Sequence, residues 1–94
     1  MKKLETFLGN NNHIILRENN DVFLFSYGVP VASVDKIGRL TLYEDWNYSK
    51  TTTKFVYLFI DEYANSIIGW NDAKNKKALL EKLISKGEIK VENI

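Results

Sequence analysis

The chain of 94 residues has no cysteine and only one histidine. Without cysteine it can form neither disulfides nor thiolate metal sites. With one histidine and no glycine-rich phosphate loop, the usual pairs of nucleophile and base and the usual nucleotide-binding motifs lack their residues. His13 has no sequence neighbour that would tune or orient its imidazole, so we interpret it as a structural or exposed residue. No His, Asp and Glu residues have metal-ligand spacing, so the sequence predicts a protein that is not an enzyme and holds no cofactor and no metal.

Long hydrophobic runs are also absent. The first residues, Met1–Phe7, lack the apolar region of a signal peptide. No apolar segment approaches the roughly 20 residues that span a bilayer. We therefore expect a cytoplasmic protein with no membrane partner.

Neither sign of charge dominates either half of the chain. Residues 1–48 carry five Lys and Arg against six Asp and Glu, and residues 49–94 carry eight Lys against six acidic residues, which gives the net charge of +1. A protein that binds nucleic acid mainly by releasing counterions usually has a denser basic face. Nucleic acid is therefore a possible partner but not the favoured one.

Strand-like patterns occupy the first half of the chain, and helical periodicity occupies the second half. Hydrophobic residues make up 45% of the chain, which is enough for a core at this length. We predict a single α+β domain over residues 1–94, with a sheet half at about 13–43 and a helical half at about 50–87.

Four strands joined by short turns are predicted in the sheet half, because runs of β-branched and aromatic residues alternate with Gly, Asn and Asp. Connections this short allow only antiparallel pairing, so we expect a four-stranded antiparallel meander. Val22–Ser26 is apolar on both of its faces. Residues 2–8 are predicted to form a short helix that Gly9 and Asn10–Asn12 end. The predicted strands are 13–17, 22–26, 29–34 and 39–43.

Two helices are predicted in the helical half. Residues 51–64 have an apolar arc that covers more than half of the helical circumference. We expect this helix to lie between the sheet and the next helix, because both sides of it need burial. A second, amphipathic helix is predicted over 72–86, with Asn71 or Asp72 as its cap. Residues 89–91 are predicted to add a last short strand.

A polar cluster opens the first of these helices and is the first candidate site. Unpaired amides and a positive dipole end lie at a helix N-terminus, so hydroxyls and lysines there can hold a phosphate, a carboxylate or nucleic acid. The alternative is that Ser49, Thr51 or Thr52 caps the helix and the other hydroxyls face water, which stabilises the helix by about 1 kcal/mol. The candidate residues for anion or nucleic-acid binding are Ser49, Lys50, Thr51, Thr52, Thr53 and Lys54.

Aromatic residues interrupt the polar connection between the sheet and this helix, which makes the connection the second candidate site. Exposed aromatic side chains often dominate protein interfaces, and they also stack on unpaired bases. The alternative is that Tyr43 and Trp46 cover the core. The candidate residues for partner binding are Tyr43, Glu44, Asp45, Trp46 and Tyr48.

Two segments carry motifs that resemble those of a known protein family. Ser26–Ala32 matches a Ser-Tyr-x-x-x-Val-Ala strand motif, and Tyr48–Lys54 matches a Tyr-Ser-x-Thr-Thr-x-Lys helix start. Over about Val22–Tyr63 the chain therefore resembles a family of small uncharacterised proteins that phages and plasmids encode. Members often carry His after the last Lys of the second motif, where this chain has Phe55, so no role of that histidine carries over.

The resemblance implies a mobile-element setting, in which small proteins without catalytic residues commonly bind and inhibit host proteins. We therefore expect a small non-enzymatic protein-binding module whose partner is a host protein, of the anti-CRISPR-like kind that inhibits a host defence nuclease. The alternative function is a nucleic-acid-binding accessory protein that uses the Ser/Thr/Lys helix start. The sequence leaves open the oligomeric state and any role of residues 67–94, which lie outside the resemblance.

Overall fold

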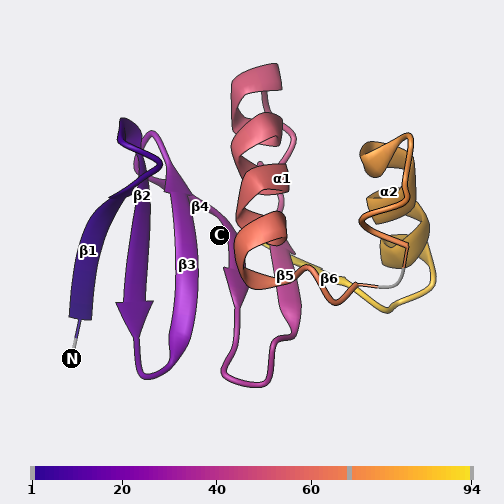
Figure 1. The fold of residues 1–94 in the computed structure, drawn as a ribbon, viewed down its shortest axis with the longest axis horizontal. Helices are drawn as coiled ribbons and strands as arrows, with labels where there is room; N and C mark the ends of the chain where they lie inside the picture. Colours follow the sequence, from indigo (N-terminus) through magenta and orange to yellow (C-terminus); the bar gives the residue numbers. More distant parts are fainter. Residues whose placement is uncertain (1, 68, 94) are drawn as a thin grey trace.

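The computed structural model describes residues 2–67 and 69–93, which form one six-stranded sheet and two helices (Figure 1). The order of the strands in the sheet is β1-β2-β3-β4-β5-β6. The α+β class is therefore confirmed, but the predicted number of four strands is wrong. The elements are β1 (Lys2–Phe7), β2 (Asn10–Glu18), β3 (Asp21–Ser26), β4 (Val29–Val34), β5 (Leu40–Tyr43), α1 (Lys50–Tyr63), α2 (Lys76–Ser85) and β6 (Lys90–Glu92).

Strands β1 to β5 form an antiparallel meander. Asn19 and Asn20 join β2 to β3 with positive φ angles of 54° and 72°, and Tyr27 and Gly28 join β3 to β4 with 52° and 82°. Positive φ at both central residues is typical of the two-residue turns that match the twist of a hairpin. The predicted meander over residues 13–43 is therefore confirmed, because its turns have the residues that this geometry needs.

The N-terminal segment is a strand, so the predicted helix over residues 2–8 is wrong. It pairs with β2 along most of its length, for example Leu4 with Leu16, and Asn10 lies inside β2 instead of breaking the structure. Phe7 is buried, and its ring lies edge-on to the ring of Phe55, with 6.2 Å between the centroids. A helix of seven residues is unstable by itself, whereas pairing and burial stabilise this strand.

The C-terminal elements depart from the prediction in their boundaries. Helix α2 begins at Lys76, because Asn75 is its N-cap and accepts a hydrogen bond from the amide of Ala78 at 3.0 Å. The predicted start near Asn71 or Asp72 is therefore wrong. The last strand forms one residue later than predicted and pairs parallel to β5, with the two helices as the crossover.

The core lies between α1 and one face of the sheet. Ile15, Leu24 and Leu42 from neighbouring strands are fully or almost fully buried, as are Phe59 and Ile60 from α1. Figure 1 shows α2 at the β6 end of the molecule, far from β1. In the part of the chain that the structure describes, neither helix is long and apolar enough to cross a membrane.

The connector between the helices packs against the other side of α1. Trp70 is fully buried, its ring lies edge-on to Tyr57 of α1, and its Nε1 donates to Asp61 Oδ1 at 2.6 Å. Leu80 of α2 is also buried in the core. Helix α1 is therefore enclosed on two sides, as predicted. The second helix alone was expected to cover the side of α1 that faces away from the sheet, but Trp70 of the connector also covers it.

Candidate functional site

Two segments that are distant in the sequence meet in a hollow at the start of α1. One segment runs from the end of β3 into β4, and the other runs from the loop after β5 into α1. They are the segments that carry the two motifs noted in the sequence. We call this hollow the tyrosine pocket, and its lining residues are Ser26, Tyr27, Val29, Val31, Asp45, Tyr48, Ser49 and Thr52.

Two exposed tyrosines line the tyrosine pocket. Tyr48 is 81% exposed and Tyr27 is 62% exposed, which makes them two of the most exposed large hydrophobic side chains among the described residues. Tyr27 is held in place because it occupies a tight turn, donates its amide to the Asn12 carbonyl at 2.8 Å and packs edge-on against His13. A fixed aromatic side chain loses little conformational entropy when a partner covers it.

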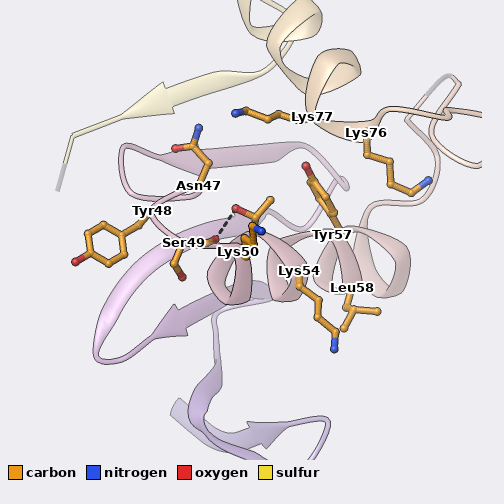
Figure 2. Close-up of a pocket in the computed structure, with 10 residues that line it drawn as sticks. Asn47, Tyr48, Ser49, Lys50, Lys54, Tyr57, Leu58, Lys76 and Lys77 are labelled. Carbon is orange, nitrogen blue, oxygen red and sulfur yellow. Dashed lines mark hydrogen bonds between the residues drawn. The ribbon is translucent and has the colours of Figure 1, made fainter.

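A second hollow adjoins the first and shares Tyr48 and Ser49 with it (Figure 2). We call it the lysine groove. It follows α1 from its start to Leu58 and reaches the start of α2. Its lining residues are Asn47, Tyr48, Ser49, Lys50, Thr53, Lys54, Tyr57, Leu58, Lys76 and Lys77.

The four lysines of the groove have different surroundings. Lys76 is engaged within the protein, because its Nζ donates to the Trp70 carbonyl at 2.8 Å and lies 4.6 Å from the centre of the Trp70 ring. Lys50, Lys54 and Lys77 are exposed, and no ion pair involving them is found among the described residues. Figure 2 shows Lys54 and Lys77 pointing to different sides of α1, so the free charges spread along the groove.

A chain of buried hydrogen bonds forms the floor beneath the tyrosine pocket. Ser49 Oγ donates to Thr52 Oγ1 at 3.2 Å, and Thr52 Oγ1 lies 3.0 Å from Ser26 Oγ. Ser26 Oγ lies 3.1 Å from His13 Nε2, and His13 Nδ1 lies 3.0 Å from Asn10 Oδ1. Each hydroxyl and the ring N–H can donate to the next group in the direction from Ser49 to Asn10, so every polar group in this series has a hydrogen-bond partner. The series of hydrogen bonds links β2 and β3 to α1.

The imidazole at the centre of this chain is neutral and enclosed. His13 is fully buried, and its ring stacks on Phe55 with 3.8 Å between the centroids. Burial lowers the pKa of His13 below its ordinary value. Asn10 Oδ1 also accepts from the Asn12 amide, which identifies it as an acceptor and assigns the ring proton to Nδ1.

Ser26, His13 and Asn10 stand in the order of a nucleophile, a base and an orienting group. Ser26 is only 4% exposed and its hydroxyl also contacts Thr52, and His13 is fully buried with its ring stacked on Phe55. We interpret the arrangement as a structural network that fixes the floor of the pocket. Among residues 2–67 and 69–93, no three His, Asp or Glu side chains gather as metal ligands.

A family model of unknown function, DUF8033, matches residues 2–78 of the chain. The chain belongs to this family. The match covers strands β1 to β5 and all the lining residues of the tyrosine pocket and the lysine groove, and it ends in the first turn of α2. No curated protein and no solved structure matches the chain.

In this DUF8033 chain, most hydroxyls of the Ser/Thr/Lys cluster have partners within the protein. Ser49 is the N-cap of α1 and accepts from the Thr52 amide at 3.1 Å. Thr52 is buried in the hydrogen-bonded chain, and Thr53 donates its hydroxyl to the Ser49 carbonyl at 2.8 Å. Thr51 is exposed. The structure therefore favours the capping interpretation, with Ser49 as the cap, and leaves Lys50, Thr51 and Lys54 as the exposed residues of the cluster.

The aromatic residues of the second candidate site lie in three different environments. Tyr43 is half-buried and its hydroxyl lies 3.3 Å from Ser33 Oγ, Trp46 is buried in the core, and Tyr48 is exposed at the tyrosine pocket. Glu44 and Asp45 are exposed, and only Asp45 lines the pocket. Trp46 therefore covers the core, as the alternative interpretation predicted, and Tyr48 is the aromatic side chain of this loop that a partner can reach.

Sequence reasoning did not single out two residues of this surface. Tyr27 stands in the first motif of the resemblance, and Lys77 stands in the predicted amphipathic helix, but neither was assigned to a candidate site. Both residues lie beside the start of α1 because segments that are distant in the sequence pack together there. No local sequence pattern encodes that packing. The one available signal was that both motifs of the resemblance, at Ser26–Ala32 and Tyr48–Lys54, contribute to the lining.

Proposed function

We propose that this DUF8033 chain is a small non-enzymatic module that binds a host protein through the tyrosine pocket and the lysine groove. The observation that carries the proposal is the placement of two exposed tyrosines, Tyr27 and Tyr48, beside three lysines without ion-pair partners among the described residues. Tyrosine is enriched at protein interfaces, and unpaired lysines favour an acidic partner. The expected partner surface is therefore acidic and offers pockets or edges for two aromatic rings.

The spread of the charges supports an extended partner. A small anion would need donors that converge on one point, whereas Lys54 and Lys77 point to different sides (Figure 2). The two adjoining hollows together follow the loop before α1, the start of α1 and the start of α2. A folded protein or a peptide segment can follow such a path.

The resemblance to phage and plasmid proteins supports a more specific form of the proposal, an inhibitor of a host defence nuclease that acts in the cytoplasm. A basic contact surface would not imitate DNA in a nucleic-acid channel. It would bind an acidic surface of the nuclease instead.

Site-specific photo-crosslinking tests the proposal, because the chain has no natural cysteine. We expect a benzophenone attached at Tyr48→Cys to capture a discrete protein from host lysate that survives nuclease treatment. The matched control is Ile37→Cys, which is exposed in the turn between β4 and β5 and lies outside both hollows. Equal capture at both positions would contradict the proposal.

Nucleic acid is the second candidate, favoured by the same lysines and by tyrosine rings that can stack on bases. Three free lysines neutralise at most about three phosphates, which corresponds to a salt slope of about −2 to −3. Such a surface would give weak binding at physiological salt. Capture at Tyr48→Cys that nuclease treatment abolishes would replace the protein-binding proposal with this one.

A further inference from the structure

The hydroxyl groups in the floor of the tyrosine pocket have no proton left for a ligand. His13 carries its ring proton on Nδ1, so its Nε2 is an acceptor and Ser26 donates to it at 3.1 Å. Thr52 then donates to Ser26 at 3.0 Å, and Ser49 donates to Thr52 at 3.2 Å. A hydroxyl has a single proton, and each of these three protons is used within the protein. The floor therefore offers a ligand acceptors and no donors.

Asp45 provides a further acceptor at the pocket. It is the one charged side chain among the described residues that line the hollow, and it is exposed. No ion pair or side-chain hydrogen bond of Asp45 is found in the part of the chain that the structure describes. Ser49 Oγ, which accepts the Thr52 amide, keeps one more lone pair. An anion would meet acceptors here, whereas a cation with several N–H groups would meet partners for them.

The rest of the pocket suits a cation on an apolar stem. The exposed rings of Tyr27 and Tyr48 present π faces that attract a cation, and their phenol groups can donate or accept. Val29 is half-buried and Val31 is buried, so they form apolar lining against which methylene groups can pack. The hollow has a volume of about 560 Å³, which is in the range of pockets that take a whole ligand.

We propose that the tyrosine pocket binds an arginine side chain of the partner, an inference that rests on the proposed function. A guanidinium group has five N–H donors in a planar fork, so it can pair with the Asp45 carboxylate and stack on a tyrosine ring at the same time. A lysine ammonium group is more strongly hydrated and has no planar face to stack. The partner would place this arginine beside the acidic groups that face the lysine groove. Opposite charges in two adjoining hollows would fix the direction in which the partner lies.

The start of α1 does not oppose a cation strongly. The positive end of a helix dipole is equivalent to about half an elementary charge, whereas the Asp45 carboxylate carries a full negative charge. Two amides of the first turn are already occupied, because the Thr52 amide donates to Ser49 Oγ at 3.1 Å and the Thr53 amide donates to the Ser49 carbonyl at 2.9 Å. Lys50 lines the lysine groove and not the tyrosine pocket. The balance of charge at the pocket therefore favours a cation.

Amide chemical-shift titration of the full chain with N-acetylarginine amide tests the pocket without a host protein. The matched probes are N-acetylcitrulline amide, which has a similar shape without the charge, and N-acetylglutamate α-amide, which is an anion, all at one ionic strength. We expect the arginine probe to shift the resonances of the pocket residues with a Kd of about 10 mM and to bind at least about fivefold more tightly than the citrulline probe. The glutamate probe is expected to give no saturable shift at the pocket.

One pair of variants assigns this binding to the pocket. Asp45→Asn is expected to weaken binding of the arginine probe at least about fivefold. The control Asp72→Asn removes the same charge from an exposed site outside both hollows and is expected to change the affinity by less than about twofold. The spectra also show whether each variant is folded. If Asp45→Asn fails to fold, Tyr48→Leu takes its place, with an expected loss of about threefold because it removes an aromatic face.

Three results would overturn the proposal: equal binding of the arginine and citrulline probes, tighter binding of the glutamate probe, or unchanged affinity in whichever folded pocket variant is used. Because the probes need no host protein, these results concern the pocket alone. Capture from host lysate tests the proposed function separately.

Discussion

Replacing Trp46 with alanine is expected to lower the free energy of unfolding by about 3 to 5 kcal/mol. Trp46 is 5% exposed and belongs to the core cluster, although it lies in a loop between polar residues. Removal of a buried indole loses its transfer free energy and leaves a cavity that the surrounding side chains fill only in part. Urea denaturation followed by circular dichroism measures this change.

The matched control is Tyr48→Ala, two residues later in the same loop. Tyr48 is 81% exposed and has no described hydrogen bond from its hydroxyl, so its replacement is expected to change the stability by less than about 0.5 kcal/mol. If Trp46→Ala were as stable as the wild-type chain, Trp46 would be a surface residue and the assignment of Tyr48 as the accessible aromatic of this loop would fail.

The stability of the wild-type chain is expected to fall as the pH drops below about 6.5, the ordinary pKa of histidine. Burial holds the pKa of His13 below that value in the folded state, so the unfolded chain binds the proton more tightly. The folded state therefore loses stability as the pH falls through the pKa of the unfolded chain, by up to about 1.4 kcal/mol per pH unit. Above that pH, the imidazole is neutral in both states and contributes no slope.

His13 is the only histidine, so one variant isolates its effect. We expect His13→Gln to be less stable than the wild-type chain at neutral pH, because it loses the stacking on Phe55, and to show little pH dependence between about 7.5 and 5.5. Denaturant titrations at several pH values measure the slope. The same slope in the wild-type chain and in His13→Gln would contradict the buried neutral imidazole.

Local chemistry made the meander and the first helix predictable from the sequence. Asn19 and Asn20, Tyr27 and Gly28 mark hairpin turns, and Ser49 stands where a helix cap is expected. The identity of the N-terminal segment was not predictable in this way. Its seven or so residues have no strong local preference, and pairing with β2 decides their conformation. The parallel pairing of β6 with β5 likewise depends on a crossover of two helices.

The candidate site was predictable only in part, because local composition indicates some of its residues and tertiary packing brings in the others. Tyr48, Lys50 and Lys54 stand in segments whose composition indicated a site, and the structure leaves them exposed. Tyr27 and Lys77 join them only through the packing of β3 and α2 around α1. In the loop after β5, composition alone does not predict which aromatic side chains are buried. The aromatic residues at positions 43, 46 and 48 are half-buried, buried and exposed, respectively.

The buried series of hydrogen bonds could not be predicted from the sequence either. His13, Ser26 and Thr52 are separated by 13 and 26 residues, and they meet because β2, β3 and the start of α1 are neighbours in space. The lone histidine was interpreted as structural or exposed, and the structure shows that it is structural and fully buried. Its partners explain why a polar group is tolerated there.

The affinity of the captured protein for charge-matched variants tests the proposed binding surface most directly. One variant carries Lys50→Gln, Lys54→Gln and Lys77→Gln in the lysine groove. Its control carries Lys36→Gln, Lys82→Gln and Lys86→Gln, which remove the same charge from exposed sites outside that groove. We predict that the groove variant binds at least about tenfold more weakly and that the control changes affinity by less than about twofold. Equal weakening in both variants would show that net charge, and not the lysine groove, governs binding.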